Sequence, residues 1–142
     1  MIDKSEFYHG AALIRAIEDY RCQSIRRHDF GYVVNDSCLV HVKYTTKAHS
    51  PWRFTISADD EARLRGAAGG FDQCVIAFVC GGDGVCAVPW ADLQSVLTTP
   101  PTWIAAKRAF SACYSVSGPG GTLKRKVALN RWPEILFEGT SE

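Results

Sequence analysis

The chain has 142 residues, of which 46% are hydrophobic and 22% are charged. This length suits one domain, and this composition excludes an intrinsically disordered chain. No stretch approaches the roughly 20 apolar residues that a membrane-spanning helix needs, and no apolar run of signal-peptide length follows the charged first residues. The six scattered cysteines include no Cys-x-x-Cys pair, which favours reduced, buried thiols over a disulfide scaffold. We therefore expect a single cytoplasmic domain over residues 1–142, with no membrane partner.

The net charge of +1 conceals a segregation of charge along the chain. Residues 21–55 carry six Lys or Arg side chains against Asp29 and Asp36, a balance of +4, and residues 93–133 carry six without an acidic residue, a balance of +6. Such segregation is typical of a basic face that meets a polyanion. The alternative is that these charges only keep exposed strands soluble.

The first predicted element is a helix over residues 4–21, with Asp3 or Ser5 as its N-cap. Apolar and small side chains recur at a three- and four-residue spacing, which is typical of one face of an amphipathic helix that packs on the core. The residues with this spacing are Phe7, Gly10, Ala11, Ile14, Ile17 and Arg21.

Three strands and a second helix are predicted next. Residues 31–34 and 38–44 are apolar and flank a polar turn, which predicts a hairpin. Residues 52–56 alternate between apolar and polar side chains as a third strand does. Ser57 is a suitable N-cap for a short helix that ends near residues 66–70.

The remaining elements extend the sheet. Residues 73–80 form a continuous apolar run, which predicts a strand buried on both faces, and a glycine-rich turn leads from it to a strand at 85–88. A helix is predicted at 91–97, and strands are predicted at 103–108, 114–117 and 123–129. The expected fold class is α+β, with a mixed sheet, an αβββαβ-like core, flanking helices and a β-rich C-terminal tail.

The order of the first elements resembles the core of the PD-(D/E)XK, or restriction-endonuclease-like, nuclease superfamily. In that superfamily a carboxylate on a central strand and a following acid-x-lysine bind a divalent metal and ready water for attack on a phosphodiester. The nearest match here is Asp36 at the hairpin turn, followed by His41-Val42-Lys43. The resemblance implies that Asp36 and Glu18 hold Mg²⁺, while Lys43 stabilises the charge on the phosphate and His41 stands at the acidic position.

His41 and Lys43 have the same parity in their strand, so both side chains point to one face. The superfamily has Glu, Asp or sometimes Gln where this chain has His41, and an imidazole suits a hard cation such as Mg²⁺ poorly. The alternative is that His41 and Lys43 are ordinary polar residues on a half-exposed strand.

A second cluster lies between the second and third predicted strands. It combines cations, hydroxyls and aromatic rings, which in nucleic-acid-binding proteins contact phosphates and stack on bases. The residues that we expect to bind nucleic acid are Lys47, His49, Trp52 and Arg53. For Trp52 there is an alternative, because its parity with Phe54 and Ile56 also suits a side chain that points into the core.

Two functions are therefore carried forward. The first is a small nucleic-acid-associated protein with a nuclease-like core, whose metal-dependent activity, if present, is atypical. The second is a non-catalytic module that binds a protein partner, such as an inhibitor, immunity or adaptor protein. A Cys86 or Cys113 nucleophile also stays open, although no local motif supports one.

Overall fold

The computed structural model describes residues 1–109 and 112–138. In this part of the chain, five strands form a mixed sheet in the order β1 (Ile25–His28), β2 (Gly31–Val34), β3 (Cys38–Thr45), β5 (Gln73–Cys80) and β6 (Gly84–Pro89). Four further strands of the described residues form an antiparallel sheet in the order β4 (Trp52–Ile56), β7 (Thr102–Lys107), β8 (Ser115–Gly118) and β9 (Gly121–Thr122). The helices are α1 (Lys4–Ile17), α2 (Ala58–Ala68), α3 (Trp90–Leu93), α4 (Arg131–Glu134) and the 3₁₀-helix η1 (Ile135–Phe137). The α+β fold class is confirmed.

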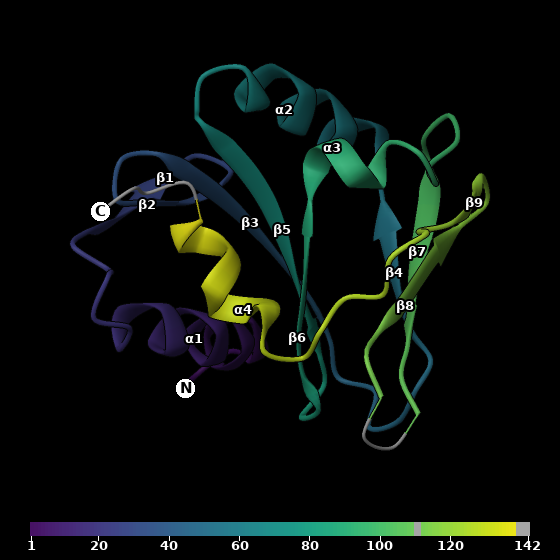
Figure 1. The fold of residues 1–142 in the computed structure, drawn as a ribbon, viewed down its shortest axis with the longest axis horizontal. Coiled ribbons are helices and arrows are strands. Elements are labelled where there is room, and N and C mark those ends of the chain that lie inside the picture. Colours follow the sequence, from purple (N-terminus) through teal and green to yellow (C-terminus); the bar gives the residue numbers. More distant parts are fainter. Residues whose placement is uncertain (110–111, 139–142) are drawn as a thin grey trace.

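The mixed sheet is the central layer of the molecule. One of its faces packs against α1, α4 and η1, and the other packs against the antiparallel sheet, α2 and α3 (Figure 1). Strand β5 shows this arrangement most directly, because Ile76 and Phe78 belong to one core while Val75 and Ala77 belong to the other. All four side chains are fully buried. The prediction that residues 73–80 form a strand buried on both faces is confirmed.

Helix α1 turns a different side to the sheet from the one that its apolar spacing predicted. Ala12 and Ala16 are fully buried, whereas Phe7, Ile14 and Ile17 are exposed by 61%, 49% and 55%. The small alanine side chains let the helix approach the bulky Trp132 closely, and the Trp132 indole Nε1 donates a hydrogen bond to the Ala12 carbonyl at 3.0 Å. The predicted core face of α1 is therefore a surface face.

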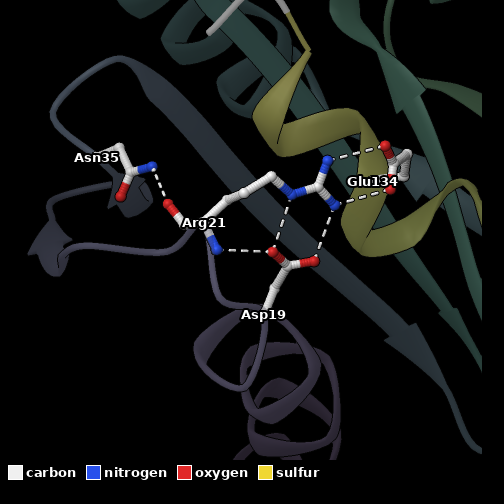
Figure 2. Close-up of polar contacts among 4 residues, drawn as sticks. All are labelled: Asp19, Arg21, Asn35 and Glu134. Atoms are coloured by element: carbon white, nitrogen blue, oxygen red, sulfur yellow. Dashed lines mark hydrogen bonds and ion pairs between the residues drawn. The ribbon is translucent and has the colours of Figure 1, made fainter. Parts of the chain in front are cut away.

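An ion-pair network ends α1 earlier than predicted and ties it to α4 (Figure 2). Asp19 accepts hydrogen bonds from the backbone and side chain of Arg21, which closes a turn in place of another helical turn. The guanidinium of Arg21 also donates to both carboxylate oxygens of Glu134, at 2.9 and 2.8 Å. Asn35 in the β2–β3 turn donates to the Arg21 carbonyl. Arg21 thus lies between the end of α1, the mixed sheet and α4.

Two strand predictions need correction. The 52–56 strand exists as β4, but it belongs to the antiparallel sheet and not beside the 31–44 hairpin. A strand that was not predicted, β1, pairs instead with β2 at the edge of the mixed sheet. The exposed charges of Arg26 and Arg27 hid this strand in the sequence, since charged edge strands lack an apolar pattern.

The C-terminal tail is less β-rich than expected. Residues 123–129 contribute an isolated bridge, Tyr114 to Val127, and not a continuous strand. They are followed by α4 and η1, which were not predicted. The predicted helix at 91–97 is shorter, as α3 ends at Leu93. Within the residues that the structure describes, no helix combines the length and apolar character needed to cross a membrane.

Candidate functional site

A pocket of about 420 Å³ lies at a free edge of β3. Strand β3 pairs with β5 along its whole length, but its register with β2 runs only from Cys38 to Val40. Among the described residues, no strand pairs with that side of β3 from His41 onward, and this part of the strand lines the pocket. The other walls come from α1, β4 and α2, through His9, Arg53 and Asp60.

Lys43 and Asp60 form the central ion pair of this pocket. The distance from Lys43 Nζ to Asp60 Oδ2 is 2.9 Å, and each side chain retains 20% exposure. Burial alone would raise the pKa of Asp60, but hydrogen bonds from Lys43 and from the Ser57 backbone outweigh it and hold that pKa below its ordinary value. Asp60 also completes the capping box of α2, whose predicted N-cap Ser57 is confirmed. The acid is therefore held in position from two sides.

His41 lies beside Lys43, as the strand parity predicted. Its ring stacks on Phe30 with 3.9 Å between centroids, and its Nδ1 lies 2.8 Å from the Phe30 carbonyl. A carbonyl only accepts, so Nδ1 carries the proton and Nε2 of the neutral ring is an acceptor. This Nε2 is buried and has no hydrogen-bond partner among the described residues. Burial lowers the pKa of His41, which favours the neutral ring.

A second histidine faces the pocket from α1. His9 Nδ1 lies 2.9 Å from the Tyr32 hydroxyl, and its ring meets Tyr32 and Tyr44 edge-on. Tyr44 in turn stacks on Tyr8 at 5.0 Å between centroids. Burial lowers the pKa of His9 as well. Both imidazoles therefore enter the pocket as neutral groups held by aromatic neighbours.

Arg53 extends the pocket onto the outer face of the antiparallel sheet. Its guanidinium lies 4.4 Å from the centroid of the Trp103 ring, a cation–π contact. The β4–β7 register places Thr55 opposite Trp103, and the burial of both strands alternates so that Arg53, Thr55 and Trp103 share the outer face. With Lys43 and Arg53 against Asp60, the formal charge of the pocket is +1, counting the histidines as neutral.

The basic loop after β3 lies outside the pocket lining. Lys47 and His49 are exposed, and Lys47 Nζ donates to the Pro51 carbonyl at 2.8 Å. Gly81 fixes the base of this loop, because it has a φ of +55° and a side chain there would stand 2.2 Å from the Lys47 carbonyl oxygen. The loop therefore presents Lys47 and His49 to solvent on a defined backbone.

Trp52 is buried, with 2% exposure. Its Nε1 donates to the Lys47 carbonyl at 3.0 Å, and its ring meets Tyr114 edge-on at 6.1 Å between centroids. It is not available to stack on a base, so the expected role of Trp52 in nucleic-acid binding is wrong and the inward alternative is confirmed. The half-buried Trp103 occupies the outer face instead.

The carboxylates expected to hold Mg²⁺ lie elsewhere. Asp36 is 73% exposed in the β2–β3 turn and pairs with Arg26, while Glu18 is exposed at the end of α1. Neither lines the pocket of Lys43. Among residues 1–109 and 112–138, no group of three or more His, Cys, Asp or Glu side chains gathers as a metal site would require. Because Mg²⁺ prefers several oxygen ligands, the single paired carboxylate of the pocket does not fit it.

A larger pocket, of about 770 Å³, lies between the end of α1 and residues 128–133. Its charged groups balance, because Arg15 and Arg108 stand against Glu18 and Asp19. The pocket of Lys43 is the better candidate for an anion because its formal charge is +1.

His41, Lys43 and Arg53 are predicted site residues that the structure brings together at this pocket. The other members of the site, Asp60, His9 and Trp103, are not among the predicted site residues. Trp52 has the parity of the apolar Phe54 and Ile56, which indicates that its side chain points inward. An aromatic ring on the outer face of this sheet therefore has to come from another strand. Comparisons with protein-family models, curated proteins and solved structures find no match to this chain.

Proposed function

We propose that this protein is a small nucleic-acid-associated protein that binds the sugar–phosphate backbone in the pocket beside β3. The observation that carries the proposal is the convergence of His41, Lys43 and Arg53 on one concave surface. Lys and Arg side chains supply the sequence-independent part of nucleic-acid binding through their contacts to phosphates. The exposed Lys47 on the adjoining loop adds a third cation at the rim.

Trp103 supports the binding of single-stranded nucleic acid at the same surface. Its ring lies on the open face of the antiparallel sheet with Arg53 above it. An aromatic ring beside a cation is the arrangement on which unpaired bases stack while their phosphates are neutralised. The hydroxyl of Thr55, opposite Trp103 in the register, is a further hydrogen-bonding group on this face.

The proposal is one of binding, without a step through Mg²⁺. Metal-dependent cleavage stays a prediction of the nuclease resemblance alone, because the carboxylates it assigned lie outside the pocket. Burial lowers the pKa of both His9 and His41, so these imidazoles are neutral polar groups of the pocket rather than counter-charges for phosphate.

The test is the salt dependence of binding to short labelled duplex and single-stranded oligonucleotides. If Lys43, Lys47 and Arg53 each neutralise one phosphate, the log–log slope on duplex DNA is at least about −2.7, from roughly −0.9 per contact. Arg53→Ala and Lys47→Ala each reduce the steepness by about 0.9. Arg65→Ala is the matched control, since it removes an exposed cation of α2 outside the pocket and leaves the slope unchanged.

Trp103→Ala distinguishes binding of single-stranded oligonucleotides from binding of duplexes. It weakens single-strand binding by roughly tenfold, corresponding to the lower part of the range for one stacked base, and leaves duplex binding nearly unchanged. If the protein binds neither DNA nor RNA at low salt, the proposal is wrong and a protein-binding module becomes the leading function.

A further inference from the structure

The N-terminal segment carries most of the large apolar surface that the structure describes. Within residues 1–109 and 112–138, seven large hydrophobic side chains are exposed, and six of them lie in the first 20 residues. These six are Met1, Ile2, Phe7, Ile14, Ile17 and Tyr20. Exposed apolar side chains gathered in one place, rather than scattered singly, mark interaction surfaces.

Three of these side chains form a stripe along α1. At 3.6 residues per turn, Phe7, Ile14 and Ile17 lie within about 80° of one another around the helix. Gly10 lies on the same stripe, and a side chain there would meet nothing within 4 Å. The opposite side of the helix holds the buried Ala12 and Ala16, so the stripe points away from the core.

The charges around the stripe argue against a polyanion or an anionic membrane as its partner. The six charged residues of this segment are Asp3, Lys4, Glu6, Arg15, Glu18 and Asp19, which sum to −2. Surface helices that bind anionic lipids carry an excess of Lys and Arg beside their apolar face. The partner of this stripe is therefore an apolar protein surface of mixed charge.

We propose that this partner is a second copy of the chain, with the two α1 helices packed antiparallel about a two-fold axis. With the axis at the level between Gly10 and Ala11, Phe7 of one copy lies opposite Ile14 of the other, and each Gly10 lies opposite Ala11. The small side chains allow close approach at the crossing point, and the larger ones fill the space on either side. A two-fold contact of this kind uses the same surface on both copies.

The charge pattern favours the antiparallel arrangement. Lys4 and Glu18 lie on the same flank of the stripe, about 40° apart around the helix. Antiparallel pairing brings Lys4 of one copy to within one residue of the level of Glu18 of the other, so each copy adds one attractive pair to the flank, and Arg15 lies a further 20° away from the stripe. Parallel pairing about a two-fold axis would instead place the two flanks on opposite sides of the contact, with Lys4 and Glu18 at different levels, so no such pair would form.

The pocket at the end of α1 adds a second complementary contact. This 770 Å³ pocket is lined by Arg15, Glu18 and Asp19 of the helix and by Leu129 and Trp132. In the antiparallel dimer, the exposed Ile2 of the second copy lies at the level of Asp19. The apolar N-terminal residues of each copy thus lie beside the pocket of the other.

Sedimentation equilibrium of the full chain over a range of concentrations tests the dimer. A single helix face buries less surface than a standard protein interface, so we expect a reversible monomer–dimer equilibrium in the micromolar range. Ile14→Lys shifts the protein to monomer, whereas Ala62→Lys, which places the same charge on an exposed position of α2, leaves the dimer intact. A monomer at every concentration, or a dimer insensitive to Ile14→Lys, would overturn the proposal.

A charge exchange tests the antiparallel orientation. Lys4→Glu and Glu18→Lys each weaken the dimer roughly fivefold, because each turns two attractive rim pairs into repulsive ones. The double variant restores the original affinity to within about twofold. Failure of the double variant to restore it would overturn the antiparallel pairing. Circular dichroism and the thermal midpoint of each variant, expected to match the parent, confirm that the fold is retained.

Discussion

Lys43 on β3 and Asp60 on α2 form an ion pair, with 2.9 Å between Nζ and Oδ2, inside the pocket proposed to hold phosphate. A phosphate that reaches Lys43 must share the ammonium group with this carboxylate. Asp60 thus holds Lys43 in place and also competes with the ligand for its charge.

The first prediction follows from this competition. Asp60→Asn releases the charge of Lys43 and tightens oligonucleotide binding roughly two- to fivefold, in line with the modest energies of partly exposed ion pairs. Lys43→Met removes the cation and weakens binding while flattening the salt slope. Fluorescence anisotropy titrations at fixed salt measure both. Weaker binding by Asp60→Asn, with the fold retained, would show that phosphate does not reach Lys43.

The second prediction concerns His41 and pH. Its pKa in the folded protein is lowered from 6.5 chiefly by burial, with Lys43 lowering it further and the Phe30 carbonyl and Asp60 opposing. The unfolded chain therefore takes up this proton first as the pH falls. The contribution of neutral His41 to the free energy of unfolding is complete above about pH 6.5 and is lost as the pH falls from there toward the folded pKa.

Urea denaturation of the parent and of His41→Gln at several pH values measures this effect. The difference between the two curves isolates His41 from His9, whose pKa is also lowered by burial. The variant is expected to lose less stability than the parent between neutral pH and mildly acidic pH. Parallel curves would show that His41 has an ordinary pKa.

A third prediction concerns the junction of the two sheets. Asp83 in the β5–β6 turn accepts from the Arg108 guanidinium and, at 2.7 Å, from the buried Tyr114 hydroxyl. Tyr114→Phe removes one hydrogen bond to a charged group and costs about 1.5–3 kcal/mol. The control is Arg26→Gln, which breaks the exposed pair with Asp36 and leaves the urea midpoint nearly unchanged.

The fourth prediction concerns the thiols. Burial raises the pKa of Cys38 and Cys80 to about 12 and that of Cys74 to about 11, and it raises the pKa of Cys86 well above its usual value. Only thiolates react rapidly with a disulfide reagent. In the folded protein at mildly alkaline pH, the exposed Cys113 is modified first, and these four cysteines react only after denaturation.

Phe78→Ala gives the fifth prediction. The ring is fully buried at the centre of β5 and lies 4.7 Å from the Phe54 ring of the other sheet, centroid to centroid. Its removal leaves a cavity between the sheets and costs about 3–5 kcal/mol, measured by urea denaturation. A midpoint equal to that of the parent would mean that the two sheets close over the gap.

The elements that could be predicted are those whose local sequence pattern is compatible with only one secondary structure and one burial pattern. The unbroken apolar run of β5 fits only a strand covered on both faces, and Ser57 with Asp60 fits the start of a helix. Strand parity likewise placed His41 and Lys43 on one face. In each case the decisive contacts are made by residues close in the sequence.

The rest depended on partners that are distant in the chain. The alanines of α1 face the core because Trp132 and its neighbours already fill the space above the mixed sheet, and nothing near α1 in the sequence reveals this. Strand β1 is defined by its pairing with β2 rather than by its own charged side chains. The Lys43–Asp60 pair likewise exists only because the chain leaves the mixed sheet after β3, forms β4 in the other sheet and returns through α2.

The bridge from Arg21 to Glu134 joins residues 113 positions apart, and the Trp132 contact to Ala12 spans 120. During synthesis at about 5–20 residues per second, the first of these contacts has to wait roughly 6–23 s after α1 leaves the ribosome. A 14-residue helix is marginal on its own in water. For that interval α1 lacks α4, and both its alanine face and its apolar stripe are accessible to chaperones. Helix α1 is thus synthesised first but is among the last elements to form its tertiary contacts.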